Sequence, residues 1–497
     1  MKRLSVLLII SISTFGLLPA QPMEEIRIGS KKFTESVTLG EITTGLIGTV
    51  HQPVIHLQEL GGTRVLWNAL IRGEIHLYPE YTGTIIQEIL AGSESLTEEN
   101  LPEILSTYNV RMSKPLGFNN SYALGMNARL AEQLSIEKIS DLKNYPELRF
   151  GFTNEFMDRQ DGWINLQKYY SLPQKDVRGL DHDLAYRGLS ANSIDVIDLY
   201  STDAEIDYYQ LKVLEDDLNF FKKYYAVILY REELENRAPQ IVQKIILLEG
   251  EINASEMREM NKKVKIDRLS ENEVAVQFIN KKFSLKLEPQ NDTMFNRFIR
   301  NTVDHLILVG ISLLSAILIA IPLGIMANRH QKFGKVILGG VGIIQTIPSL
   351  ALLVFMIPLL GIGTQPAILA LFLYSLLPIV RNTHSGLVSI PETITESARA
   401  LGLPEYAQLL KIQLPLASQS ILAGIKTSAV INVGTATLGA LIGAGGYGQP
   451  ILTGIRLDNI GLILEGAIPA ALLALLVQQI FDLSEIFFVP KGIRLKS

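Results

Sequence analysis

Four tyrosines stand where the first half of this 497-residue chain would form the loops around a cleft. They are Tyr81, Tyr122, Tyr200 and Tyr224. The face of an aromatic ring attracts a diffuse cation by about 0.5 to 2 kcal/mol, and a quaternary ammonium, which has no N–H to donate, is held in this way. These positions therefore predict an aromatic cage for a small, compact cation. Packing is the alternative for each ring, above all for Tyr200 and Tyr224, because tyrosine is favoured in strands and at interfaces.

Polar side chains accompany the tyrosines on the same predicted loops. The candidates are the hydroxyls of Thr34 and Thr63 and the carboxylates of Asp161 and Asp203, which suit a partly charged ligand. Arg159 stands two residues before Asp161, so a structural ion pair beneath the cleft is an equal alternative for that aspartate. Glu80 follows Pro79 and is expected to start a helix rather than to contact a ligand.

Other chemistry has little support in the sequence. The seven histidines are scattered, and no His-Glu-x-x-His or nucleophile-elbow phrase occurs, so an enzyme is the weaker alternative. There are no cysteines, which excludes disulfides, thiolate metal sites and a cysteine nucleophile. The net charge of -5 comes without a basic stripe, so nucleic acid is not an expected partner. We expect no catalytic residue, metal or cofactor.

The elements that would position the candidate residues alternate short strands with amphipathic helices from Glu24 to about Leu287. Strands ending near Ile28, Leu57 and Leu77 run into turn-rich loops, which would line one wall of a cleft at the carboxyl edge of a parallel sheet. Strands 149–152 and 195–199 would line an opposing wall, and the runs 122–126 and 226–230 would cross between two lobes. This pattern predicts an α/β clamshell with a hinge.

The hydropathy pattern changes beyond Asp292, where long apolar stretches approach the roughly 20 residues that span a bilayer. We expect about five spans, at residues 306–327, 336–360, 367–380, 421–442 and 462–489. Lys and Arg follow the first, third and last of them, which places those loops and the C-terminus in the cytoplasm and the α/β domain outside. A ligand-gated channel is a further alternative, but no TVGYG-type filter occurs.

The chain is accordingly divided into five predicted parts. They are a signal peptide or uncleaved signal anchor at 1–22, an extracytoplasmic domain at 23–288, a linker at 289–300, a membrane domain at 301–490 and a cytoplasmic tail at 491–497. A glycine-rich run at 443–448 would form a hinge at the outer mouth of the membrane domain. No Gly-x4-Gly-Lys-Ser/Thr phosphate loop occurs, so any ATP must be hydrolysed by a separate chain.

The longest predicted cytoplasmic loop, at 392–415, has the pattern of two short amphipathic helices. The first would stop at Gly402, and the second would begin at Pro404 and stop before Pro415. This loop resembles the coupling loop of type I ABC importer permeases, which fits into the nucleotide-binding subunit. The residues that carry the resemblance are Glu396, Ala398, Gly402, Ile412, Leu414 and Pro415, while Ser397 departs from the family pattern.

The outer domain resembles the quaternary-amine binding proteins of glycine betaine, carnitine and choline importers. The matching phrases are GSKKFTES at 29–36, LGGT at 60–63, LYPEYTGT at 77–84, NNSYALGM at 119–126, DRQDGW at 158–163 and LYSTDAEI at 199–206. The resemblance implies that the four tyrosines form the cage and that Thr84 contacts a carboxylate. Lys222-Lys223 replaces the Pro-Pro that relatives often carry before the last cage tyrosine, which leaves Tyr224 and Tyr225 as alternatives for that position.

Together these resemblances imply a type II periplasmic-binding-protein clamshell fused to an all-α type I ABC permease domain. The implied protein is a multi-pass subunit of the bacterial inner membrane that imports glycine betaine, choline, carnitine or a related betaine. Ergothioneine, which similar fused proteins bind, is the alternative ligand. Implied partners are the lipid bilayer, two copies of a separate ABC ATPase subunit and a second copy of this chain.

Overall fold

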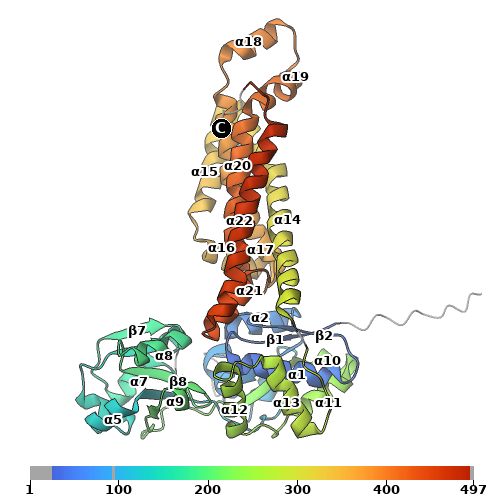
Figure 1. Cartoon of the computed structure of the whole chain (residues 1–497). Coiled ribbons are helices and arrows are strands. Elements are labelled where there is room, and N and C mark those ends of the chain that lie inside the picture. Colours follow the sequence, from blue (N-terminus) through green and yellow to red (C-terminus); the bar gives the residue numbers. More distant parts are fainter. Residues whose placement is uncertain (1–24, 92–95, 160, 291, 493–497) are drawn as a thin grey trace, which may run out of the picture.

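The computed structural model describes residues 25–91, 96–159, 161–290 and 292–492. A two-lobed α/β part forms the base of the molecule, and a helical column stands on it (Figure 1). The order predicted from the sequence, an α/β clamshell followed by a helical membrane domain, is confirmed. The predicted signal segment at 1–22 lies outside the described residues, as does most of the predicted tail.

The first lobe is built on a five-stranded sheet in the order β2-β1-β3-β10-β4. Its strands are β1 (Ile26–Gly29), β2 (Val54–Leu57), β3 (Leu77–Tyr81), β4 (Val110–Met112) and β10 (Ala226–Arg231). Strand β1 is parallel to β2 and β3, whereas β10 is antiparallel to β3 and β4. The loops that follow β1, β2 and β3 therefore meet at one edge of the sheet, as their turn-rich sequences predict.

The second lobe repeats this arrangement in a sheet of order β7-β6-β8-β5-β9. Its strands are β5 (Tyr122–Asn127), β6 (Phe150–Thr153), β7 (Val177–Leu180), β8 (Val196–Tyr200) and β9 (Leu211–Val213). Strand β5 carries the chain into this lobe, and β10 follows after it returns to the first. Beside the crossing, Asn119 and Tyr225 form an isolated antiparallel bridge. The predicted crossing at 122–126 and 226–230 is confirmed.

Helices cover both sheets. They are α1 (Thr34–Gly48), α2 (Thr63–Arg72), α3 (Thr82–Thr84), α4 (Leu101–Ser106), α5 (Ala128–Leu134), α6 (Asn154–Asp158), α7 (Trp163–Tyr170), α8 (His182–Ser190), α9 (Glu205–Tyr208), α10 (Glu233–Arg237), α11 (Pro239–Ile246), α12 (Ala254–Lys265) and α13 (Glu271–Phe283). Helices α1 and α2 begin directly after strand-ending loops, so their N-termini face the cleft edge of the first sheet.

Four helices of the described column are long and apolar enough to cross a membrane, and a bent pair would make a fifth span. The long segments are α14 (Met294–Arg329), α17 (Thr364–Val388), the continuous segment Glu405–Ile442 that contains α20 (Leu414–Thr435), and α22 (Ile460–Phe488). The bent pair is α15 (Gln331–Thr346) with α16 (Ser349–Leu360), at 100°. This pair covers the segment where the sequence predicts the second span, at 336–360. Pro348 pushes the preceding residue, Ile347, into an extended conformation, which ends α15.

The predicted helix-turn-helix loop lies at the end of the column farthest from the α/β part, where Figure 1 labels α18 (Glu392–Ala400) and α19 (Glu405–Gln408). Gly402 takes the left-handed conformation, with φ of 73°, as the predicted break requires. The expected stop before Pro415 is wrong, because α19 continues through a wide π-turn at 409–413 into α20. Pro415 has no backbone N–H to donate, and the wider turn before it accommodates this missing hydrogen bond. Helix α14 begins at Met294, inside the segment predicted to be a linker.

Candidate functional site

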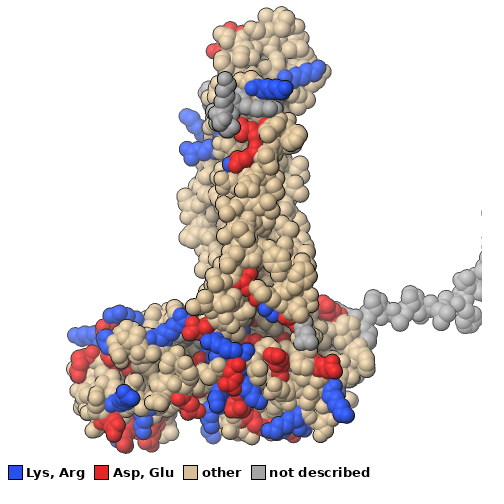
Figure 2. Space-filling model, viewed as in Figure 1, with Lys and Arg blue, Asp and Glu red and all other residues tan. Residues whose placement is uncertain are grey.

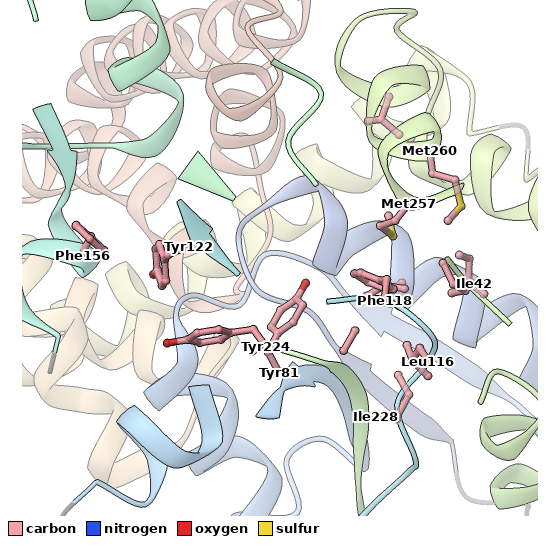
Figure 3. Packing of buried hydrophobic residues seen from close by; sticks show 14 of the residues in the cluster. Ile42, Tyr81, Leu116, Phe118, Tyr122, Phe156, Tyr224, Ile228, Met257 and Met260 are labelled. Atoms are coloured by element: carbon pink, nitrogen blue, oxygen red, sulfur yellow. The ribbon is translucent and has the colours of Figure 1, made fainter. Parts of the chain in front are cut away.

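The four predicted tyrosines line one cavity between the two lobes. The ring centroid of Tyr122 lies 5.0 Å from that of Tyr200 and 5.8 Å from that of Tyr224. Phe33 connects this group to the first lobe, since its ring lies 6.0 Å from Tyr200 and 6.2 Å from Tyr81. Figure 3 shows Tyr81, Tyr122 and Tyr224 gathered where the lobes meet. The structure therefore brings the predicted tyrosines together and adds Phe33, which the sequence reading missed.

Two cations of the protein lie over these rings. Lys31 Nζ is 5.3 Å from the centroid of the Tyr81 ring, and the guanidinium of Arg159 is 5.5 Å from that of Tyr122. Arg159 also lies 5.9 Å from the centroid of Tyr224 and donates to its hydroxyl at 3.3 Å. Both cations line the cavity, so the site combines aromatic faces with donors that suit a carboxylate. Lys31 was missed as a site residue, although it belongs to the phrase at 29–36.

Each of these cations is held by buried carboxylates. Lys31 pairs with Glu80, which is fully buried in β3, so the helix-start interpretation of Glu80 is wrong. Arg159 forms a bidentate pair with Asp161 at 2.8 and 2.9 Å and reaches Glu88 of the first lobe at 2.9 Å. Asp161 thus forms the structural ion pair with Arg159 that was the alternative to ligand binding. Because the pair is largely buried, it fixes the guanidinium beside the rings.

Glu35 is a further buried acid of the cavity that the sequence reading missed. It accepts hydrogen bonds from the hydroxyl of Tyr81 at 2.6 Å, the amide of Asn120 at 2.8 Å and the hydroxyl of Thr202 at 2.5 Å. Asn261 of α12 donates to it as well, at 3.0 Å. Burial raises the pKa of Glu35, although these hydrogen bonds oppose the shift. The contacts join the first lobe, the crossing segment and the second lobe at one carboxyl group.

The remaining predicted site residues are distributed around this centre. Thr34, Thr63 and Thr84 line the cavity, as does Asp203. Asp203 accepts from His182 at 3.1 Å, from the Tyr186 hydroxyl at 2.6 Å and from the backbone of Tyr200 at 2.8 Å. Its carboxylate therefore orders the Tyr200 loop. Of the two alternatives left by Lys222-Lys223, Tyr224 lines the cavity and Tyr225 does not.

The near end of the column touches the α/β part at several loops. Arg72 donates to the backbone carbonyl of Ile357 at 3.0 Å. Gly443, with φ of 77°, lies so close to Leu60 that an added Cβ would come within 2.5 Å of that side chain. The last residue of α21 (Gly448–Arg456), Arg456, reaches the cavity itself. The predicted hinge run at 443–448 thus lies at the contact between the two parts.

The predicted coupling residues lie at the opposite end. They are Glu396 and Gly402, which are exposed, Ala398, which is buried, and Ile412 and Pro415, which are partly buried. Four apolar side chains of the same loop are exposed: Ile394, Leu401, Tyr406 and Leu410. A short helix pair with exposed apolar residues is suited to dock into a groove on another protein.

Two family models match this chain. Residues 24–281 match the substrate binding domain of the ABC-type glycine betaine transport system. Residues 320–491 match the inner membrane component of binding-protein-dependent transport systems.

Curated relatives are known from several bacteria. The glycine betaine/carnitine/choline transport system permease protein OpuCB of Bacillus subtilis (strain 168) is 40% identical over 193 residues, 39% of this chain and 89% of the relative. The ergothioneine transport permease/ergothioneine binding protein EgtU of Helicobacter pylori (strain G27) is 31% identical over 282 residues, 55% of this chain and 51% of the relative. A solved glycine betaine/carnitine/choline ABC transporter structure shares 28% identity with this chain, covers 52% of it and 98% of that structure, and has a TM-score of 0.45. The chain belongs to the family of substrate-binding domains of ABC-type glycine betaine transport systems, joined here to a permease domain in one polypeptide.

Proposed function

We propose that this importer subunit binds a small zwitterion in which a quaternary ammonium and a carboxylate lie close together, such as glycine betaine or carnitine. The observation that carries the proposal is the meeting of aromatic faces and protein cations in one cavity. Tyr81, Tyr122, Tyr200 and Tyr224 provide faces for the ammonium. Lys31 and Arg159, with the hydroxyl of Thr84, provide donors for the carboxylate.

Choline and ergothioneine are the competing ligands. Choline carries the ammonium without a carboxylate, so it would form no ion pair with Lys31 or Arg159. Ergothioneine adds a thione ring to a betaine group, and the EgtU relative, named for both permease and binding protein, supports it as the second candidate. The relatives named for glycine betaine, carnitine and choline support the main proposal.

The column and its far loop support transport driven by a separate ATPase. Loop 392–415 lies at the end of the column away from the ligand cavity (Figure 1). Arg329, Lys335 and Arg381 precede this loop in sequence, which favours a cytoplasmic position for it and an extracytoplasmic position for the cavity. In the proposed cycle, the clamshell closes on its ligand and docks on the outer face of the column. ATP binding at the partner ATPase, transmitted through the loop, then turns the pathway of two paired chains outward to accept the ligand.

Ligand titration of the purified full chain tests the cage. Tyr122→Ala should weaken glycine betaine binding about 5- to 30-fold, because one ring contributes about 1 to 2 kcal/mol in a desolvated site. Tyr108→Ala is the matched control, since that ring packs on Trp67 away from the cavity. Equal affinities of the two variants would contradict the cage.

A second titration separates the zwitterion from the simple cation. Lys31→Gln should reduce the affinity for glycine betaine and carnitine by more than the affinity for choline, because only the first two offer a carboxylate to the lost ammonium group. Parallel loss for all three ligands would refute the assignment of the carboxylate to this side of the cavity. Tighter binding of ergothioneine than of any other ligand would favour the second candidate.

A further inference from the structure

Arg456 belongs to the permease half yet lies inside the α/β part. It ends α21, and its guanidinium donates to Glu59 at 2.6 Å, to Glu271 at 2.6 Å and to the hydroxyl oxygen of Thr34 at 2.9 Å. Only 7% of its surface is exposed. It also lines the cavity that holds the tyrosines. One side chain therefore joins the docking contact to the ligand site.

The contact of Arg456 with Glu59 and Glu271 is specific, because each buried charge needs its partner. Glu59 and Glu271 are both buried, so without Arg456 two carboxylates would stand close together out of water, at a high cost. Glu59 also accepts from Gln449 at 3.2 Å and from Thr453 at 3.1 Å, both on α21. Its φ of 59° is a left-handed conformation that is uncommon outside glycine.

Thr34 connects this contact to the ligand. It begins α1 directly before Glu35 and lines the same cavity as the tyrosines. Since Arg456 donates to the oxygen of Thr34, the hydroxyl hydrogen is left available for an acceptor in the cavity. A hydroxyl that accepts from a cation becomes a better donor, because hydrogen bonds in a chain polarise one another.

We propose that Arg456 is a residue of the ligand site that the permease half contributes on docking, acting through Thr34 to favour a carboxylate-bearing ligand. This inference rests on the proposed function. Docking adds one positive charge beside the carboxylate end of the cavity, and undocking removes it. By linkage, a zwitterionic ligand and the docked arrangement strengthen each other, whereas choline gains no such advantage.

The test uses the purified full chain in lipid nanodiscs and measures affinity for glycine betaine and for choline by titration. Arg456→Gln should weaken glycine betaine binding about 5- to 10-fold and leave choline binding unchanged or stronger. Arg187→Gln is the matched control, because Arg187 pairs with Asp458 in the same interface but does not line the ligand cavity. It should leave the ratio of the two affinities unchanged.

A double substitution examines the route through Thr34. In a Thr34→Val background, Arg456→Gln should no longer change the glycine betaine affinity, since the hydroxyl that transmits the effect is gone. An undiminished effect there would overturn the route, and so would an unchanged affinity ratio in Arg456→Gln alone. Arg456→Gln combined with Glu271→Gln, which removes one charge of each sign, provides a second version if the single variant misfolds. If the unaltered chain fails to bind glycine betaine, the proposed function fails instead.

Discussion

The two halves of this protein differ in how much of their apolar surface is buried. In the α/β part, large apolar residues such as Phe150, Phe152 and Tyr170 are fully buried. In α22, only 6% of the most apolar stretch is buried, and leucines such as Leu476 face outward. Figure 2 shows the middle of the column almost free of charged residues, with charges gathered over the base and near the far end.

Between its helices the column buries small and polar side chains alongside apolar ones. Asn432 of α20 donates to Ser312 of α14 at 3.0 Å and to Ser375 of α17 at 2.8 Å. An added Cβ at Gly424 would come within 2.7 Å of the backbone carbonyl of Pro378. Lipid is as apolar as leucine, so helices there associate through close approach and hydrogen bonds rather than through apolar burial. The comparison teaches that apolar side chains stabilise the α/β part when they are buried and suit the column when they face lipid.

The largest expected effect comes from placing a charge on the exposed surface of the column, compared with the same change on the exposed surface of the α/β part. Leu476→Lys, near the middle of α22, should disfavour membrane insertion by about 3 to 4 kcal/mol, because lysine at the centre of a span is costly. Leu184→Lys on α8 should change the stability of the α/β part by less than about 0.5 kcal/mol. The two leucines are similarly exposed, at 52% and 47%. A membrane insertion assay and denaturation of the full chain measure the two effects, and equal costs would break the comparison.

A buried acid of the α/β part should give the next largest effect. Glu41 accepts from His56 at 2.7 Å, from Gln58 at 2.8 Å and from Asn272 at 2.8 Å. Burial alone would raise the pKa of Glu41, but these partners lower it to about 2. Since the folded pKa lies below the unfolded value, the carboxylate contributes stability above about pH 4.5 that is lost as the pH falls toward 2, at most about 3 kcal/mol.

Glu41→Gln should therefore lower the unfolding free energy of the α/β part at pH 7, and the deficit should shrink by more than half near pH 3. Both tryptophans, Trp67 and Trp163, lie in the α/β part, so tryptophan fluorescence of the full chain reports its unfolding alone. A deficit that stays constant from pH 7 to pH 3 would show that the charge of Glu41 is not its source.

The smallest expected effect compares two glycines in the same conformation. Gly402 in the far loop and Gly250 in the α/β part have φ of 73° and 74°, and an added Cβ meets nothing within 4 Å at either position. Alanine should therefore cost only the backbone strain, about 1 to 2 kcal/mol. Gly402→Ala should speed hydrogen exchange in loop 392–415 about 5- to 30-fold without changing tryptophan-detected unfolding.

Gly250→Ala should do the reverse, lowering the unfolding free energy of the α/β part and leaving exchange in the loop unchanged. Gly402→Asn should restore most of the protection, because asparagine tolerates the left-handed conformation. A loop unaffected by Gly402→Ala would mean that it does not depend on this turn.

Local patterns in the sequence were enough to predict the clamshell, the crossing strands, the long apolar helices and the Gly402 turn. Apolar periodicity, turn residues and proline act over a few neighbours, so they can be read without the fold. The bend at Pro348 was not predicted, and the continuation through Pro415 differs from expectation, because a proline can either end a helix or lie within one, and the packing decides which.

The sequence by itself determined which residue types could bind a quaternary ammonium, since tyrosines at strand-ending loops are a local feature. Only the tertiary structure decided what surrounds the rings: Lys31 and Arg159 over their faces, and Arg456 beside Thr34. Arg456 and Thr34 are 422 residues apart along the chain, and a contact at that separation leaves no periodic trace in the sequence. The burial of Glu80 and Asp161 in ion pairs was decided in the same way, because a carboxylate's role depends on which cation the fold brings to it.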